Sequence, residues 1–183
     1  LTDGEIEDLR RAANNIREDI IIQLGAFVGL RAFEIPQIRP IDVKKLIPDI
    51  TGFVLRSGKI PVGMQEASDA YLPDSVERDL QRFQNQHNIA PEDPYVDLSQ
   101  PGVRAAVKRT ARRAAEATGN DDFRAVSTHD LRRRFAQRLL VDRQLNPRVV
   151  MAVGGWDSFA AIEPYLNAPS EAVVDEAFAN LDH

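Results

Sequence analysis

The sequence contains no cysteine, and this absence excludes several classes of protein. Disulfide-stabilised folds, thiolate nucleophiles and cysteine-ligated zinc sites all require cysteine, so we expect a reducing compartment. Long apolar segments are missing too. The longest, over residues 20–30, is too short to span a bilayer, and no secretory leader precedes it. These absences predict a soluble, cytoplasmic protein with no membrane partner.

Metal-binding and nucleotide-binding motifs are also lacking. The three histidines, His87, His129 and His183, are far apart in the sequence and show none of the spacings that metal ligands have. Neither a GxxxxGK(S/T) loop nor a GxGxxG loop is present. The sequence therefore predicts no metal site and no cofactor.

The charge of the chain is acidic overall but unevenly distributed. A formal net charge of −5 argues against a surface that is basic throughout. Residues 104–148, however, hold 12 Lys or Arg against 5 Asp or Glu, a net charge of +7, which leaves 11 against 23, or −12, for the rest. Segregation of this kind is what an anion-binding face requires.

Helical periodicity and capping residues predict a mainly helical α+β fold with one small antiparallel sheet. Thr2 and Glu5 have the spacing of a capping box, which predicts the start of the first helix. Glycines and β-branched residues without a helical period predict the sheet between Ile47 and Leu72, with a turn at Ser57–Gly58. Further helices are expected over residues 17–30, 32–38, 75–87, 101–118 and 147–154, and from residues 127 and 170 onward.

The helix expected from Ser127 or Thr128 begins with a histidine and an arginine on one face. His129 and Arg132 stand three residues apart near the positive end of the helix dipole, an arrangement suited to binding an anion. The alternative is a solvated basic helix, and this segment alone does not decide between the two.

Three motifs together resemble the catalytic domain of tyrosine recombinases, the phage-integrase family, over essentially the whole chain. They are GLRAFE at 29–34, HDLR at 129–132 and GGWDSFAAIEPY at 154–165. In that family an arginine follows Gly-Leu, a lysine lies on a β-hairpin, and HxxR opens a later helix. A histidine or tryptophan follows, and the tyrosine comes nine positions later. The residues at these places are, in order, Arg31, Lys59, His129, Arg132, Trp156 and Tyr165.

The resemblance implies a site-specific DNA recombinase that cuts and rejoins strands through a covalent 3′-phosphotyrosyl intermediate. Tyr165 would be the nucleophile, and Arg31 and Arg132 would bind the non-bridging phosphate oxygens, whose geometry suits guanidinium groups. His129 would accept or share the phenolic proton, and Lys59 would protonate the leaving 5′-oxygen.

Two further residues support this arrangement. Trp156 would donate a hydrogen bond to a phosphate oxygen and pack the site. Glu34, three residues after Arg31, would orient the guanidinium of that arginine. The residues expected to contact double-stranded DNA are Arg104, Lys108, Arg112, Arg133 and Arg134.

The resemblance also implies that residues 1–183 are one catalytic domain, a C-terminal fragment of a longer, nucleoid-associated recombinase. The last helix, 170–183, has an apolar stripe that is typical of a core helix. The resemblance offers the alternative that this helix docks on a neighbouring subunit in a tetrameric synapse on DNA.

Structural alternatives remain for the assigned residues. Arg31 could satisfy helix carbonyls, Lys59 could be a solvated hairpin lysine, and Trp156 and Tyr165 could belong to the core. For the whole chain, the alternatives are a type IB topoisomerase, which relaxes supercoils without a defined site, and an inactive DNA-binding or interaction module.

Overall fold

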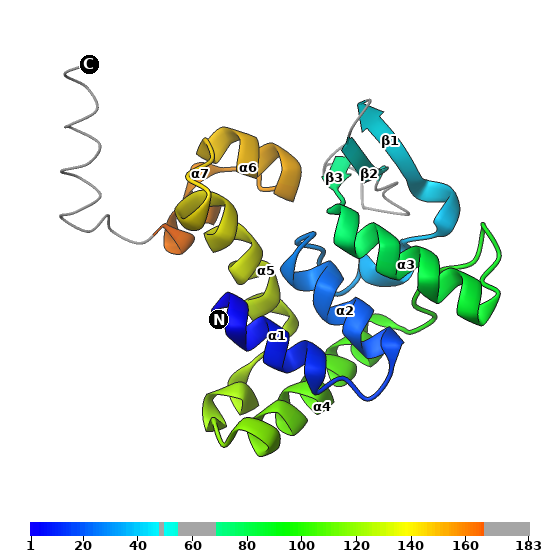
Figure 1. Cartoon of the computed structure of the whole chain (residues 1–183). Helices are drawn as coiled ribbons and strands as arrows, with labels where there is room; N and C mark the ends of the chain where they lie inside the picture. Colours follow the sequence, from blue (N-terminus) through cyan, green and yellow to red (C-terminus); the bar gives the residue numbers. More distant parts are fainter. Residues whose placement is uncertain (48–49, 55–68, 167–183) are drawn as a thin grey trace, which may run out of the picture.

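Helices form most of the chain in the computed structural model, which describes residues 1–47, 50–54 and 69–166 (Figure 1). The α-helices are α1 (Asp3–Arg11), α2 (Ile16–Ala26), α3 (Asp74–His87), α4 (Gln100–Thr118), α5 (Thr128–Gln137), α6 (Pro147–Gly154) and α7 (Phe159–Ile162). Short 3-10 turns are η1 (Ile35–Gln37), η2 (Pro40–Asp42), η3 (Asp121–Ala125) and η5 (Glu163–Tyr165), and a π-helical turn, η4 (Arg138–Asp142), follows α5. The mainly helical class predicted from the sequence is confirmed.

Side chains next to the helix starts explain where several helices begin. Thr2 and Glu5 form the predicted capping box of α1, in which each side chain binds the backbone N–H of the other residue. At the start of α5, the carboxylate of Asp130 accepts hydrogen bonds from both the N–H and the hydroxyl of Ser127. These local hydrogen bonds satisfy N–H groups that have no partner inside the helix.

The described strands form an antiparallel sheet in the order β1 (Val43–Ile47), β2 (Ile50–Val54) and β3 (Asp69–Tyr71). Val43 lies opposite Phe53, and Gly52 lies opposite Tyr71. The first strand begins before the predicted boundary. The turn predicted at Ser57–Gly58, Lys59 and the helix predicted from residue 170 lie outside the described residues.

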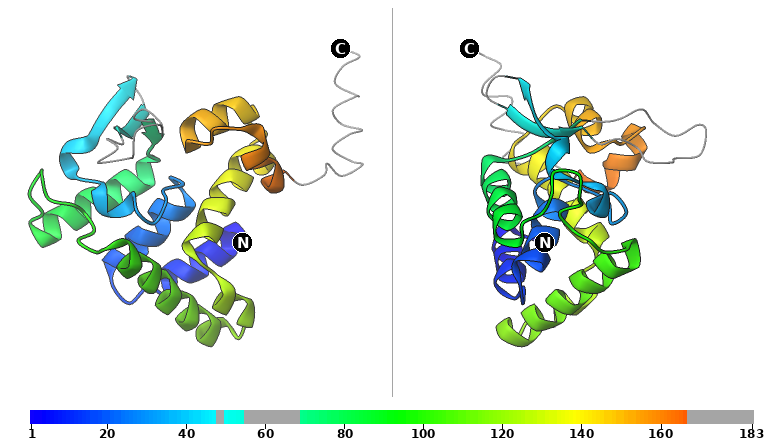
Figure 2. Two further views of the ribbon diagram at one scale, coloured as in Figure 1. Left: turned by 180° about the vertical axis from the view of Figure 1, so that it is seen from behind. Right: turned by 90° about the vertical axis from the view of Figure 1, so that its right-hand side faces the viewer.

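The core is built around α2. Eight of its eleven residues are buried, and α1, α3, α4 and α5 surround it (Figures 1 and 2). From Ile20 to Ala26 every residue is buried, and all but Gln23 are apolar, because this part of the helix meets other helices on all sides. At Gly25 it crosses α5 so closely that an added Cβ would lie 2.9 Å from the Cβ of Leu131. This crossing brings the end of α2 next to α5.

A buried carboxylate ties three helices together. Glu18 of α2 accepts hydrogen bonds from Arg113 of α4 and from the N–H of Asn14, which follows α1. Arg109, one turn before Arg113, approaches the other carboxylate oxygen to 3.5 Å. Burial of the carboxylate is tolerated because its oxygens are paired and hydrogen-bonded.

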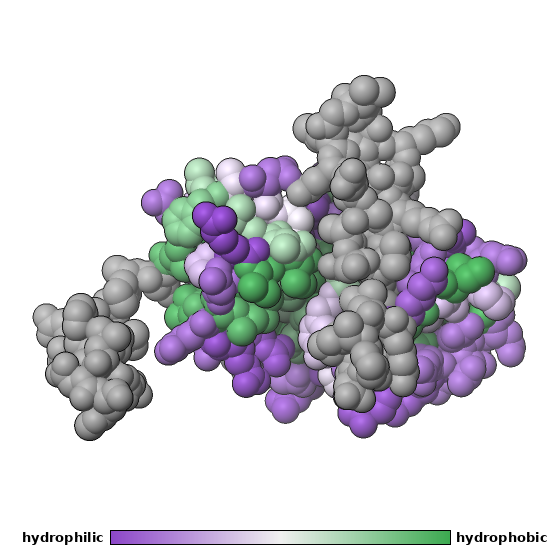
Figure 3. All heavy atoms as spheres, turned by 90° about the horizontal axis from the view of Figure 1, so that it is seen from above, coloured by the Kyte–Doolittle hydropathy of each residue, from purple (hydrophilic) through white to green (hydrophobic). Residues whose placement is uncertain are grey.

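A second, smaller apolar cluster lies on the C-terminal half of α5. It is formed by Phe135, Ala136, Leu140, Val150, Trp156, Ile162 and Tyr165. Seen from above, apolar side chains also gather on the outer face of α6 and α7, where Val149 and Phe159 are about half exposed (Figure 3). The segment from α6 to η5 is thus held against α5 by its own core. None of the helices within the described ranges has the length and apolar character needed to cross a membrane.

Candidate active site

The loop after α2 presents Arg31 toward α5 and α6. The helix ends at Ala26, earlier than predicted, and Gly29 turns the chain with a positive φ of 78°. An added Cβ at Gly29 would also overlap the ring of Phe135, so no other residue fits this turn. The N–H of Leu30 donates to the carbonyl of Leu24 at 3.0 Å, which fixes the direction in which Arg31 leaves the loop.

Glu34 orients Arg31 from two sides. Its Oε1 accepts a hydrogen bond from Nη1 of Arg31 at 2.9 Å, and its Oε2 accepts from the backbone N–H of Arg31. Nη2 of Arg31 donates to the carbonyl of Gly155 at 2.7 Å. The arginine therefore has a defined position while about a third of its side chain remains exposed. The prediction of a helix over 32–38 is wrong, because only the 3-10 turn at Ile35–Gln37 forms.

Arg132 reaches the same place from α5 and is 7% exposed. Its Nη1 donates to the carbonyl of Gly29, and its Nη2 donates to the carbonyl of Gly154 at 2.5 Å. The guanidinium lies over the ring of Trp156, 4.1 Å from the ring centroid. Burial, and next the positive charge of Arg31, lower the pKa of Arg132 to about 10, so it remains charged at neutral pH.

The two arginines meet at the C-terminal end of α6. The last carbonyls of a helix have no partner inside it and carry its negative partial charge. Gly155, with φ of 63°, turns the chain there and leaves the carbonyls of Gly154 and Gly155 directed at Arg132 and Arg31. Each guanidinium has five N–H donors. Hydrogen bonds to residues that the structure describes use two in each, and the others are left for an anion.

Arg31 and Arg132 therefore line one pocket, as the resemblance implied. Its lining residues are Val28, Gly29, Leu30, Arg31, Glu34, Ala70, Arg132, Val153 and Gly154. The charged groups in it are two guanidiniums and one carboxylate, and that carboxylate is bound to Arg31. The pocket has the charge to hold an anion.

Tyr165 lies in η5, close to His129 at the start of α5. The phenolic oxygen is 3.5 Å from Nε2 of His129, at the outer limit of a hydrogen bond. The edge of the Tyr165 ring meets Trp156, with ring centroids 6.1 Å apart, and Arg133 lies over its face at 5.8 Å. The ring is 7% exposed, whereas His129 is exposed. A phenol, an imidazole and an indole thus adjoin the arginine pocket.

The predicted DNA-binding residues differ in their exposure and in their hydrogen-bond partners. Arg104, Arg112 and Arg133 are exposed. Lys108 is half-buried and donates to the carbonyls of Arg124 and Ala125.

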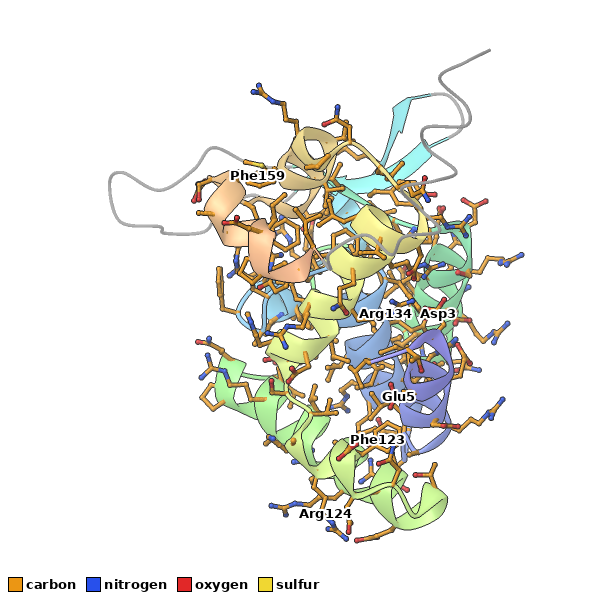
Figure 4. All side chains as sticks on the ribbon, turned by 90° about the vertical axis from the view of Figure 1, so that its left-hand side faces the viewer. Asp3, Glu5, Phe123, Arg124, Arg134 and Phe159 are labelled. Atoms are coloured by element: carbon orange, nitrogen blue, oxygen red, sulfur yellow. The ribbon has the colours of Figure 1, made fainter. Side chains whose placement is uncertain are left out.

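Arg134 does not fit its predicted role. It is buried, and its guanidinium binds Asp3 of α1 at 2.9 Å and Asp142 of η4 (Figure 4). Its charge is used inside the domain because the side chain points toward α1 and away from solvent.

The structure brings together the residues predicted from the three motifs, namely Arg31, Glu34, His129, Arg132, Trp156 and Tyr165. Lys59 lies outside the described residues. The glycine carbonyls that bind the arginines were not predicted; the only trace of them in the sequence is that GLR and GGW both place glycine next to a site residue. Within residues 1–47, 50–54 and 69–166, no group of three or more His, Asp or Glu side chains is placed to hold a metal ion.

Comparison with known proteins gives both a family and a fold. Residues 1–171 match the model of the phage integrase family. The structure is similar to that of the XerA recombinase, with a TM-score of 0.71 and 17% sequence identity, over 98% of this chain and 62% of that one. The XerH site-specific recombinase bound to its difH substrate gives a TM-score of 0.68 and 19% identity, over 97% and 52%.

A third solved structure is the Tn1549 transposon integrase in complex with transposon right end DNA. It gives a TM-score of 0.72 and 14% identity, over 100% of this chain and 66% of that one. The chain thus spans about half to two thirds of the length of these proteins. No curated protein sequence matches it.

Proposed function

This chain belongs to the phage integrase family, and from that premise we propose that it is the catalytic domain of a tyrosine-type site-specific recombinase. One observation supports the proposal above all others. Arg31 and Arg132 come from distant parts of the sequence and line one pocket. Trp156 contacts Arg132 and also meets the ring of Tyr165, whose hydroxyl is 3.5 Å from His129. Two fixed guanidiniums beside a phenol are the groups that transfer of a DNA phosphate to tyrosine requires.

In the proposed reaction, a phosphodiester of the DNA binds between Arg31 and Arg132. The phenolic oxygen of Tyr165 attacks the phosphorus, a P–O bond to tyrosine forms, and the P–O bond to the 5′-oxygen breaks. Negative charge grows on the non-bridging oxygens during this step, and the two guanidiniums stabilise it. The products are a 3′-phosphotyrosyl strand and a free 5′-hydroxyl, and the reverse reaction rejoins DNA without a cofactor.

The phenolic proton needs an acceptor because an unperturbed tyrosine has a pKa of about 10. Nε2 of His129 is 3.5 Å from the phenolic oxygen and can take this proton when its own proton is on Nδ1. We assign protonation of the leaving 5′-oxygen to Lys59 on the resemblance alone. Glu34 does not react; it holds Arg31 by both its backbone and its guanidinium.

We propose double-stranded DNA as the partner, held by phosphate contacts from the exposed Arg104, Arg112 and Arg133. The XerH and Tn1549 structures, both with DNA bound, support this proposal. Because the proposed partner is DNA, we also propose that the protein associates with the nucleoid. A tetrameric synapse, with residues 170–183 reaching a neighbouring subunit, is the assembly that we propose on the DNA. Deleting residues 170–183 should then leave the melting temperature unchanged and remove the largest protein–DNA complexes.

A covalent capture experiment tests the function. The protein is incubated with a pool of nicked duplexes that contain a randomised segment, and the DNA that remains bound after denaturation is sequenced. We expect covalent capture of duplexes that share one sequence, and no capture by Tyr165→Phe. The matched control is Tyr95→Phe, which changes a buried tyrosine outside the pocket.

Two results would count against this function. Capture of duplexes with no common sequence would indicate activity of the type IB topoisomerase kind. Absence of any covalent complex, with duplex binding intact, would indicate an inactive DNA-binding module.

A further inference from the structure

Gly154 occupies a helical position for which the backbone does not require glycine. It is the last residue of α6, and its φ lies outside the left-handed region, in contrast to Gly155 next to it. Alanine is more favourable than glycine in a helix, so the backbone alone would favour alanine at this position. Another part of the molecule must account for the glycine.

The ring of Trp156 accounts for it. A Cβ built on Gly154 would overlap Cζ3 and Cε3, two atoms of the six-membered part of the indole. The ring is also held on its other sides. Phe135 stacks on it with an interplanar angle of 16° and ring centroids 6.3 Å apart, and Tyr165 meets it edge-on. A methyl group at position 154 would therefore displace the indole from this place and from its contacts with Phe135 and Tyr165.

The ring supports Arg132. Arg132 and Phe135 are three residues apart on α5, so they share one face of the helix and both contact the indole. The guanidinium of Arg132 lies 4.1 Å from the ring centroid, and its Nη2 binds the carbonyl of Gly154 itself. One residue thus supplies both the carbonyl that holds Arg132 and the space for the ring on which Arg132 rests.

We infer that Gly154 is a positioning residue, which leaves room for the Trp156 ring to hold Arg132 in the phosphate pocket. This inference rests on the proposed function. It also assigns Trp156 a different role from the one expected at first: the face of the indole acts on Arg132, and an indole hydrogen bond to phosphate is not needed.

The inference predicts how two variants at Trp156 differ. Trp156→Phe keeps an aromatic face and loses the N–H, and the atoms it removes include those that crowd Gly154. Trp156→Leu keeps an apolar side chain, although a smaller one, and has no aromatic face. Single-turnover cleavage of the captured duplex should fall by about thirtyfold for Trp156→Leu, the rate equivalent of a desolvated cation–π contact. For Trp156→Phe it should fall by less than about fivefold, with duplex affinity unchanged in both.

A double-mutant cycle tests the part played by Gly154. Gly154→Ala should slow cleavage by about a hundredfold, the loss that a misplacement of order 1 Å can produce. In the Trp156→Phe background the same change should slow cleavage by less than about twofold, because the crowded ring atoms are gone. Equal losses in the two backgrounds, or a larger loss for Trp156→Phe than for Trp156→Leu, would overturn the inference.

Fluorescence separates this inference from the proposed function. Trp156 is the only tryptophan of the chain, so its emission reports on this ring without any cleavage. Gly154→Ala should shift the emission to longer wavelength as the ring is displaced toward solvent. The matched control is Gly4→Ala in α1, where an added Cβ has ordinary contacts; it should leave the emission unchanged.

These measurements have distinct outcomes. If Gly154→Ala leaves the emission as in the wild type, the ring has room and the inference is wrong, whatever the enzyme does. If the emission shifts but the wild type forms no covalent complex with any duplex, the proposed function is wrong. The conclusion that Gly154 leaves room for the Trp156 ring then still holds.

Discussion

Replacing Arg132 with lysine tests whether the geometry of the guanidinium matters in addition to its charge. In the structure one guanidinium bridges the carbonyls of Gly29 and Gly154 and lies over the ring of Trp156. A lysine ammonium cannot span both carbonyls and also present a planar pair of donors to phosphate. Arg132→Lys should therefore retain positive charge in the pocket and lose most of the cleavage.

The expected magnitudes follow from the contacts. Loss of one hydrogen bond from a charged donor to a buried carbonyl costs about 1.5–3 kcal/mol of stability. Loss of a donor that stabilises charge in the transition state slows the chemical step by about a hundredfold to a thousandfold. Single-turnover cleavage of the captured duplex measures the rate, and urea unfolding measures the stability.

The matched control is Arg82→Lys on α3. Arg82 is largely exposed and pairs with Asp79 at 3.7 Å, so the same exchange should change neither quantity appreciably. If Arg132→Lys cleaves within about threefold of the wild type, a fold-change well below that expected for a lost transition-state donor, charge alone is sufficient and the account of this pocket is wrong.

Three further variants test other parts of the molecule. Glu18→Ala leaves Arg113 without its buried partner and should lower the free energy of unfolding by about 3 kcal/mol. The control, Glu116→Ala on the exposed face of α4, should leave the free energy of unfolding unchanged. Equal urea midpoints for the two variants would contradict this. Burial alone would raise the pKa of Asp130, but hydrogen bonds from the side chain and backbone of Ser127 outweigh it, and the pKa lies below 3.8. At pH values above the unfolded-state pKa of about 3.9, Asp130→Ala should therefore lower the free energy of unfolding by about 1 kcal/mol. This difference from the wild type should disappear as the pH falls through the lower folded-state pKa. A difference that persists in acid would show that the carboxylate charge is not involved. Arg112→Ala should reduce the slope of log affinity for DNA against log salt by about 0.9 if Arg112 contacts one phosphate, and an unchanged slope would place Arg112 away from the DNA.

Features that depend on neighbours in the sequence were predicted well. The capping box of Thr2 and Glu5, and the helix start at Ser127, follow from hydrogen bonds within one turn. The helix expected over 32–38 failed for a reason that is equally local. Pro36 has no N–H to donate to the carbonyl of Ala32, four residues earlier, so only a 3-10 turn forms.

Features that depend on distant residues could not be predicted from pattern alone. The burial of Arg134 depends on Asp3, which lies at the other end of the chain. The pocket shared by Arg31 and Arg132 depends on the close crossing of α2 and α5 at Gly25. The motifs of the family indicated which residues to expect together, but not that glycine carbonyls hold both arginines.

The residue that becomes attached to DNA is the most direct test of the account. The covalent complex from the capture experiment can be digested with protease and nuclease, and the modified peptide identified by mass spectrometry. The account predicts one modified peptide, with the nucleotide attached through its 3′-phosphate to Tyr165. Attachment to Tyr71 or Tyr95, or linkage through a 5′-phosphate, would contradict it.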